Sequence, residues 1–270
     1  MQKEKPNKTV LAGHKHELLQ KIVTANDIRQ ALKKDEFMLY YQPQINSRSG
    51  CLTGMEALLR WKHPERGFIS PKQFIAIAEE TGQIIEIGDW ALRAACRQRK
   101  IWNNMGLIQI PLAVNISICQ LENHHIIETI TEILQETGLD SKWLELEITE
   151  SSAISNFNYV ACILRRLKKL RISVAIDDFG TGNTTFDHLR MFPIDTIKID
   201  KSYINKIGVN ATDEAILRSI ISLASFLNMR VVAEGVEKKQ QIDFLMTEGC
   251  DIIQGFYYYK PLPAKIWKNF

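Results

Sequence analysis

Short apolar runs alternate along most of the chain with longer segments whose apolar residues recur at helical spacing. The apolar runs predict strands at 37–45, 52–61, 110–117, 143–149, 172–178, 195–200, 229–234 and 251–256. The amphipathic segments predict helices at 26–34, 71–81, 84–104, 119–137, 158–170, 211–227 and 237–248. Ser70, followed by Pro71 and by Gln73 at the capping-box position, is expected to cap the second of these helices.

Eight strands with helices between most of them predict a single TIM-like (β/α)₈ barrel, an α/β fold. An open doubly wound sheet is the alternative, although the sequence contains neither a Gly-rich dinucleotide fingerprint nor a phosphate-loop motif. Residues 1–24 are polar and weakly patterned, so we interpret them as a tail or the remnant of a linker. The barrel domain is expected to occupy residues 25–270.

Composition narrows the class of protein. The chain has 270 residues, of which 45% are hydrophobic and 24% charged, with a net charge of +3. This charge gives no argument for binding a DNA or RNA polymer, and no apolar run approaches the roughly 18 residues that span a bilayer. The N-terminus lacks the apolar core of a signal peptide. The five cysteines are scattered, which predicts reduced core thiols in a cytoplasmic protein.

Two adjacent carboxylates end one predicted strand. The run from Ile172 leads into Asp177 and Asp178, and Gly180 and Gly182 follow at once, so the chain is expected to turn sharply there. Adjacent carboxylates repel each other unless a cation or a shared proton relieves them. A hard divalent metal such as Mg²⁺ or Mn²⁺ is the simplest such cation, because it prefers oxygen ligands.

Other strands end on polar side chains as well. In a barrel the chemistry gathers at the carboxyl ends of the strands, and the residues placed there are Glu56, Asn115, Glu147, Asp177, Asp178, Lys198, Glu234 and Gln254. Burying carboxylates is costly unless they are paired or bind metal, so the pattern predicts two hard cations that act on a phosphoester. Lys198 could orient the nucleophile, deprotonate it or only neutralise the acids. Arg60 is well placed to contact a phosphate.

Several acidic residues also have simpler interpretations. Glu145 and Glu150 could face solvent, although Glu145 shares a strand face with Glu147. Asp200 could form a local ion pair with Lys198 instead of contacting substrate. Glu237 could stabilise the start of its helix through the helix dipole.

Ordered motifs in this chain resemble those of the EAL domain family. The resemblance covers about residues 27–263 and includes the segments Tyr41–Pro43, Glu56–Arg60, Val114–Ser117, Glu147–Glu150, Asp177–Gly182, Ile197–Asp200, Ala233–Glu237 and Gln254–Phe256. The resemblance implies a bacterial phosphodiesterase that hydrolyses cyclic di-GMP to linear pGpG with two Mg²⁺ or Mn²⁺ ions.

The resemblance also implies roles for single residues. Glu56, Asn115, Glu147 and Asp177 would hold the first metal, and Asp177 would bridge to a second one that Asp178 and Glu234 support. Lys198 would contact the catalytic water, and Gln254 and Glu237 would complete the site. Glu150 would brace the loop after Asp178. The expected contacts with substrate are Gln42, Arg60, Asp200 and Gln254.

One segment departs from the family pattern. Asn183, Thr184, Thr185 and Phe186 stand where the family commonly has an aromatic residue followed by two small ones. EAL domains usually dimerise near this loop, so a homodimer is expected, with turnover and dimer geometry sensitive to the change. A non-cleaving EAL-like receptor or protein-interaction domain is the alternative function. A barrel hydrolase for another phosphodiester is a third.

Overall fold

The computed structural model of the chain describes residues 23–106, 109–182 and 186–269. These residues belong to two compact units. One unit comprises Met1–Met38 and Leu59–Ile84, and the other comprises Leu39–Leu58 and Ile85–Phe270. Of the departing loop segment, residues 183–185 lie outside the described part of the chain.

The smaller unit contains two helices and a short hairpin. Helix α2 (Ala25–Lys33) is capped by Thr24, whose side chain accepts from the backbone N–H of Asp27 in a capping box. Helix α3 (Pro71–Glu80) has Ser70 at its N-cap, but the Ser70 side chain makes no capping hydrogen bond, so that part of the prediction is wrong. Strand β3 (Gly67–Ile69), which the sequence did not predict, pairs antiparallel with the end of β2.

The larger unit contains the barrel. Its strands are β1 (Phe37–Asn46, from residue 39), β2 (Leu52–His63, to residue 58), β4 (Leu112–Asn115), β5 (Leu144–Thr149), β6 (Ser173–Phe179), β7 (Thr196–Ile199), β8 (Arg230–Glu234) and β9 (Ile252–Gln254). They follow the order β1-β9-β8-β7-β6-β5-β4-β2, and the pairing of β1 with β2 closes the ring. The predicted eight-stranded barrel is therefore confirmed.

Strand β1 differs from the other barrel strands in its direction. It runs antiparallel to β9, whereas the remaining neighbours from β2 to β9 are parallel. The cause is the short turn between β1 and β2, in which Asn46 donates its N–H to the Cys51 carbonyl and Gly50 takes a φ of 70°. A tight turn can join antiparallel strands only, because a parallel pair needs a long crossover.

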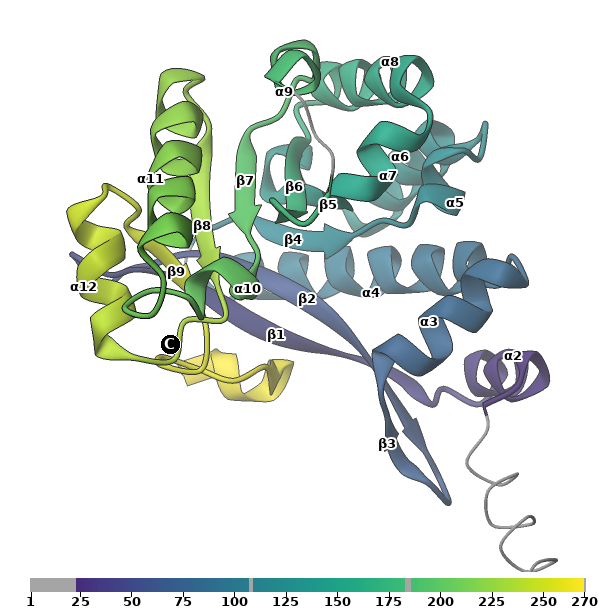
Figure 1. The fold of residues 1–270 in the computed structure, drawn as a ribbon. Helices are drawn as coiled ribbons and strands as arrows, with labels where there is room; N and C mark the ends of the chain where they lie inside the picture. Colours follow the sequence, from purple (N-terminus) through teal and green to yellow (C-terminus); the bar gives the residue numbers. More distant parts are fainter. Residues whose placement is uncertain (1–22, 107–108, 183–185, 270) are drawn as a thin grey trace, which may run out of the picture. The chain divides into compact units, whose positions relative to one another are not determined.

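Helices surround the strands of the larger unit. They are α4 (Ile84–Asn104), α5 (Ile118–Leu121), α6 (Ile126–Thr137), α7 (Glu150–Ser155), α8 (Phe157–Lys169), α9 (Phe186–Met191), α10 (Lys201–Ile204), α11 (Ala211–Phe226) and α12 (Lys239–Thr247). Figure 1 shows α11 alongside β8 and α8 on the outer side of β6, and both pairs are in contact. The chain ends with β10 (Leu262–Pro263) and a 3₁₀ helix at Ala264–Asn269, and another 3₁₀ turn, Ser141–Trp143, precedes β5.

The single helix predicted at 119–137 is divided in the structure. Ser117 caps the short helix α5 through a capping box with Gln120, and the chain then turns before α6 begins at Ile126. Helix α6 ends at Gly138, which has the left-handed conformation expected of a C-terminal cap.

Strand β5 shows how the fold separates core from site. Leu144, Leu146 and Ile148 belong to the hydrophobic core outside the ring of strands, while Glu145 and Glu147 alternate with them and are also buried. Because successive side chains of a strand point to opposite faces, both glutamates project into the barrel. The expectation that Glu145 faces solvent is therefore wrong.

The structure also bears on the predictions about membrane spans and cysteines. Among the described residues, no helix is long and apolar enough to cross a bilayer. The prediction of core thiols is correct for Cys96 and Cys250, which are buried, and wrong for Cys51 and Cys162, which are exposed. All five cysteines are free.

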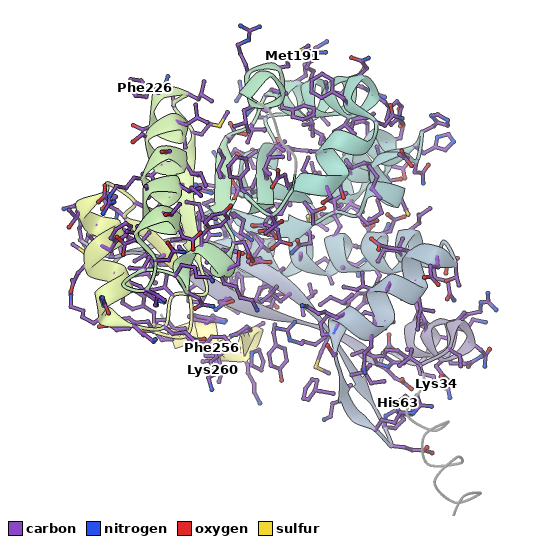
Figure 2. The ribbon with its side chains drawn as sticks, in the orientation of Figure 1. Lys34, His63, Met191, Phe226, Phe256 and Lys260 are labelled. Carbon is purple, nitrogen blue, oxygen red and sulfur yellow. The ribbon has the colours of Figure 1, made fainter. Side chains whose placement is uncertain are left out.

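Two helices of the larger unit, α9 and α11, end on exposed hydrophobic side chains. Phe226 at the end of α11 is 86% exposed and Met191 at the end of α9 is 45% exposed. Figure 2 shows both side chains at the periphery of the ribbon. In the same view Lys260 lies beside Phe256, where its ammonium is 5.5 Å from the ring centroid.

Candidate active site

A buried lysine lies at the centre of the polar site. Lys198 has no exposed surface, and its Nζ is close to four carboxylates: Glu147 Oε2 at 2.7 Å, Glu234 Oε1 at 2.8 Å, Glu56 Oε2 at 3.2 Å and Asp177 Oδ1 at 3.3 Å. These acids come from strands β2, β5, β6 and β8, and the lysine comes from β7. The fold thus brings together side chains that are distant in the sequence.

Strand register explains this convergence. Asn115 pairs with Glu147 across β4 and β5, and Thr149 pairs with Asp177 across β5 and β6, so these polar residues lie toward the carboxyl ends of neighbouring parallel strands. The pairing of β6 with β7 shifts register between Ile176 and Phe179. Such an irregularity bends a strand and redirects its side chains.

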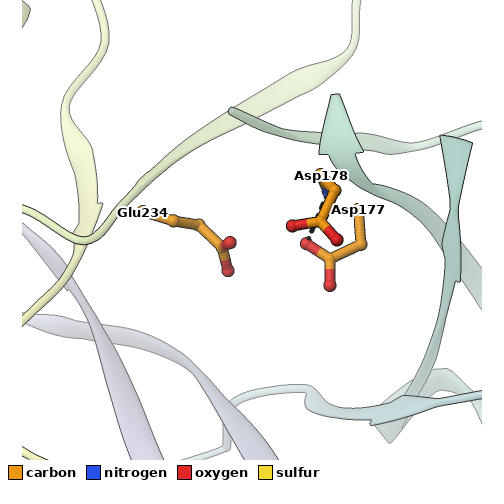
Figure 3. Close-up of side chains that lie close together, drawn as sticks. All are labelled: Asp177, Asp178 and Glu234. Atoms are coloured by element: carbon orange, nitrogen blue, oxygen red, sulfur yellow. Dashed lines mark hydrogen bonds between the residues drawn. The ribbon is translucent and has the colours of Figure 1, made fainter. Parts of the chain in front are cut away.

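The two adjacent aspartates lie where β6 bends. Asp178 has a positive φ of 53° and Gly180 one of 97°. Figure 3 shows Asp177 and Asp178 facing Glu234 across a short gap, and one carboxylate oxygen from each of the three lies within 4.8 Å of the others. This acidic group is compact enough to hold a cation.

The charge balance of the site favours cation binding. Burial, together with the carboxylates of Glu56, Asp177 and Glu234, raises the pKa of Glu147 well above its usual value despite the attraction of Lys198. Burial also raises the pKa of Glu234 to about 8, with Asp177 and Glu56 adding to the effect. Partial burial and the carboxylates of Asp177 and Asp200 raise the pKa of Asp178 to about 6. The acids are therefore in excess over the single ammonium.

One buried oxygen in the site lacks a protein partner. Glu147 Oε1 has no hydrogen-bond donor within the described structure, although its residue is fully buried. An unpaired carboxylate oxygen is costly in a protein interior. A divalent cation would satisfy it, so the residues present fit the metal that the sequence predicts.

Hydrogen bonds orient Glu56 and the predicted ligand Asn115. Asn115 Nδ2 donates to Glu56 Oε1 over 2.7 Å, while Gln254 Nε2 donates to Glu56 Oε2. Burial alone would raise the pKa of Glu56, but Lys198 and these two amides lower it overall. Glu56 is thus held in its charged form.

Glu150 lies beneath the loop that follows Asp178, and it is buried, so the expectation that it could face solvent is wrong. Its Oε2 accepts from the backbone N–H groups of Gly180 over 2.8 Å and of Gly182 over 2.9 Å. Sequence reasoning missed Tyr203, whose hydroxyl donates to the Gly180 carbonyl over 2.8 Å. Side chains from α7 and α10 therefore hold both the N–H and the carbonyl of Gly180.

Gln42 and Gln254 are buried neighbours in this site. Gln42 donates to the Tyr259 carbonyl over 3.1 Å, and Gln254 Nε2 lies 3.4 Å from Gln42 Oε1. Sequence reasoning missed Gln44, which is buried on β1 and contacts Gln254.

Three predicted residues make their described hydrogen bonds outside the carboxylate ring, although Asp200 lies close enough to Asp178 for its carboxylate to raise the pKa of that residue. Asp200 caps α10 by accepting from the N–H of Ser202 over 2.9 Å, and the described ion pairs of Lys198 are with other acids. Glu237 is exposed and precedes α12, which begins at Lys239. Arg60 belongs to the smaller unit, where its Nη1 donates to the Leu59 carbonyl over 2.8 Å.

Glu145 belongs to a separate buried network. Arg230 Nη2 donates to both carboxylate oxygens of Glu145, each over 2.8 Å, and Thr196 Oγ1 donates to Glu145 Oε2 over 2.9 Å. These residues stand at or near the first positions of their strands, β5, β7 and β8. We therefore interpret this network as structural, because barrel chemistry belongs to the opposite strand ends.

Comparisons with known proteins agree with this fold. The family model for the EAL domain matches residues 25–261. The bifunctional diguanylate cyclase/cyclic di-GMP phosphodiesterase MucR of Pseudomonas aeruginosa is 39% identical over 89% of this chain and 35% of its own length. The cyclic di-GMP phosphodiesterase PdeR of Escherichia coli is 38% identical over 88% of this chain and 36% of its length. The chain thus spans about a third of these relatives.

Solved structures extend the comparison. The structure of the PaMucR phosphodiesterase in complex with c-di-GMP superimposes with a TM-score of 0.87 at 39% identity, covering 89% of this chain and 98% of that one. The EAL enzyme Bd1971, bound to cAMP and cyclic di-GMP, gives a TM-score of 0.87 at 28% identity, with 97% of this chain and 71% of that chain covered. With a family model that covers most of its length and a barrel that superimposes closely on these structures, the chain belongs to the EAL domain family.

Proposed function

We propose that this domain is a phosphodiesterase that hydrolyses one phosphodiester bond of cyclic di-GMP and releases linear pGpG with the help of two Mg²⁺ or Mn²⁺ ions. The observation that carries the proposal is the ring of four carboxylates around Lys198, in which Glu147 Oε1 has no partner. Relatives named as cyclic di-GMP phosphodiesterases support the choice of substrate.

The predicted metal ligands are proposed to form two groups. Glu56, Asn115, Glu147 and Asp177 are proposed to hold one ion, and Asp178 and Glu234 are proposed to support a second ion that Asp177 shares. The compact arrangement of Asp177, Asp178 and Glu234 supports the second group. When bound, such ions polarise the phosphoryl group and lower the pKa of water.

Lys198 is proposed to orient the attacking water. Burial alone would lower its pKa, but the carboxylates of Asp177, Glu147, Glu234 and Glu56 raise it well above the usual value. In the metal-free domain the ammonium therefore keeps its proton and acts as a hydrogen-bond donor.

Roles are also proposed for the remaining predicted residues. Gln42, Gln254, Arg60 and Asp200 are proposed to contact the substrate, and Glu237 to complete the site. Glu150 is proposed to hold the loop after Asp178 in a conformation that presents the two aspartates, which its hydrogen bonds to Gly180 and Gly182 support. A homodimer formed through that loop is part of the proposal.

Incubation of the metal-stripped protein with cyclic di-GMP and each divalent cation, followed by chromatography, tests the proposal. We expect pGpG with Mn²⁺ or Mg²⁺ and none with chelator. The Glu56→Ala variant should yield none under any condition. A panel of other cyclic and linear phosphodiesters separates cyclic di-GMP hydrolysis from a broader hydrolase. Binding of cyclic di-GMP without product in every cation would select the receptor alternative and reject ours.

A further inference from the structure

Gln44 lies inside the barrel behind the predicted site residues. It is 1% exposed, and its Nε2 donates to Gln254 Oε1 over 3.2 Å. Gln254 in turn donates from Nε2 to Glu56 Oε2. A chain of hydrogen bonds therefore runs from β1 through β9 to the carboxylate on β2.

The direction of this chain follows from its last member. Glu56 is a charged acceptor, so the end of Gln254 that faces it must be the amide nitrogen, which donates. The oxygen of Gln254 then faces Gln44, and only a donor can satisfy it there. The NH₂ group of Gln44 supplies that donor. An acceptor or an apolar group at this position would leave the Gln254 oxygen unpaired or favour the flipped amide.

The backbone of β2 leaves space for Gln44. A Cβ added to Gly54 would lie 2.3 Å from Gln44 Oε1 and 3.1 Å from its Cδ. These distances are too short for any side chain at position 54 without moving the Gln44 amide. The absence of a side chain at Gly54 therefore makes room for the Gln44 amide. Gly54 lies two residues before Glu56 on strand β2.

We propose that Gln44 is a positioning residue that fixes the amide orientation of Gln254 and, through it, the carboxylate of Glu56. This inference deepens the proposed function, because Glu56 belongs to its metal site. Groups that hydrogen-bond to metal ligands typically change metal affinity by about 10- to 100-fold when they are removed. Gln44 acts one bond further away, so we expect a loss of about tenfold.

Calorimetric titration with Mn²⁺ in the absence of nucleotide tests the inference. Gln44→Met keeps the volume and removes the donor, whereas Gln44→Glu replaces the donor by an acceptor. We expect affinity to fall from wild type to Gln44→Met, and further to Gln44→Glu. Gln120→Met is the matched control, because Gln120 is a buried glutamine whose described side-chain hydrogen bonds are with Ser117. It should bind Mn²⁺ as the wild type does.

A double-mutant cycle separates positioning from packing. If Gln44 acts through Gln254, the double variant Gln44→Met/Gln254→Met should bind Mn²⁺ no more weakly than Gln254→Met alone. Additive losses, or unchanged affinity in Gln44→Met, would overturn the inference. Urea unfolding shows whether each variant is as stable as the wild type. If Gln44→Met is equally stable but binds Mn²⁺ more weakly, a loss of core packing cannot explain the weaker binding.

A second readout needs neither metal nor activity. The side-chain NH₂ resonances of Gln254 in the metal-free protein, assigned by their absence in Gln254→Met, should shift in Gln44→Met and stay unchanged in Gln120→Met. Unchanged resonances in Gln44→Met would reject the role of Gln44 even if the domain proves to be a phosphodiesterase. Conversely, if the Gln254 resonances shift in Gln44→Met but the wild type hydrolyses no cyclic di-GMP, only the proposed function is refuted.

Discussion

The ammonium of Lys198 lies 2.7 Å from Glu147 Oε2, and both side chains are completely buried. Among the described residues, Lys198 is the only basic side chain that forms ion pairs with the carboxylates of Glu56, Glu147, Asp177 and Glu234. A barrel interior tolerates such acids when cations compensate them.

Replacing Lys198 by methionine should destabilise the metal-free domain. The substitution keeps most of the volume but leaves four acids without their common partner, and breaking a buried ion pair in this way costs about 3–5 kcal/mol. Urea unfolding in chelator measures the loss. Mn²⁺ should restore part of the stability, because it binds the folded state only.

Lys142→Met is the control for that experiment, since Lys142 forms an exposed ion pair with Asp140. Exposed pairs contribute about 0–1 kcal/mol. A Lys198→Met protein as stable in chelator as Lys142→Met would show that the buried acids need no compensating cation.

The stability of the metal-free domain should fall as pH rises from about 5 to about 8. Glu234 has its pKa raised from the usual 4.5 to about 8 in the folded state. Between these values the folded protein retains a proton that the unfolded chain releases, so a rise in pH favours unfolding. Urea unfolding at several pH values in chelator should therefore show a weaker pH dependence for Glu234→Gln than for the wild type. Equal slopes in the two proteins would contradict the raised pKa.

Replacing Glu150 by glutamine should loosen the loop after Asp178. A neutral amide oxygen accepts more weakly than a carboxylate, so the amide hydrogens of Gly180 and Gly182 should exchange with solvent faster than in the wild type. Hydrogen exchange in the metal-free protein measures this directly. Tyr203→Phe removes only the hydroxyl bonded to the Gly180 carbonyl and should increase exchange in the same segment. Unaltered protection in both variants would mean that neither contact holds the loop.

Thiol reactivity should divide the cysteines by their surroundings. Cys51 and Cys162 are exposed, whereas Cys96 and Cys250 are buried and burial raises the pKa of each to about 12. Because the thiolate is the reactive form, labelling of the native protein followed by peptide mapping should find Cys51 and Cys162 modified first. Cys96 and Cys250 should react only after unfolding. Rapid labelling of either buried thiol would contradict the packing of the core.

Much of the fold could be predicted because its signals are local. The apolar runs gave the barrel strands, and the strand-end rule selected Glu56, Glu147, Asp177, Lys198 and Glu234, which the structure brings together. Side-chain direction on β5 was harder, since Glu145 and Glu147 share a face and only the contacts with Arg230 and Thr196 show what Glu145 does. No pattern along the chain could reveal those contacts.

Residues that act through partners distant in sequence also escaped prediction. Gln44 is separated from Gln254 by 210 positions and Tyr203 from Gly180 by 23, so neither has a local signal. The capping prediction for Ser70 was wrong for the opposite reason. Ser70 has the local sequence of an N-cap, but its side chain makes no capping hydrogen bond. Local preference permits such a bond, and the surrounding structure decides whether it forms.

Anomalous diffraction from a crystal grown with Mn²⁺ would locate the proposed ions. We expect manganese within coordination distance of Glu147 Oε1, with oxygens of Glu56 and Asp177 as further ligands, and a second ion near Asp178 and Glu234. Manganese absent from the carboxylate ring at saturating concentration, with Glu147 Oε1 still unpaired, would contradict it.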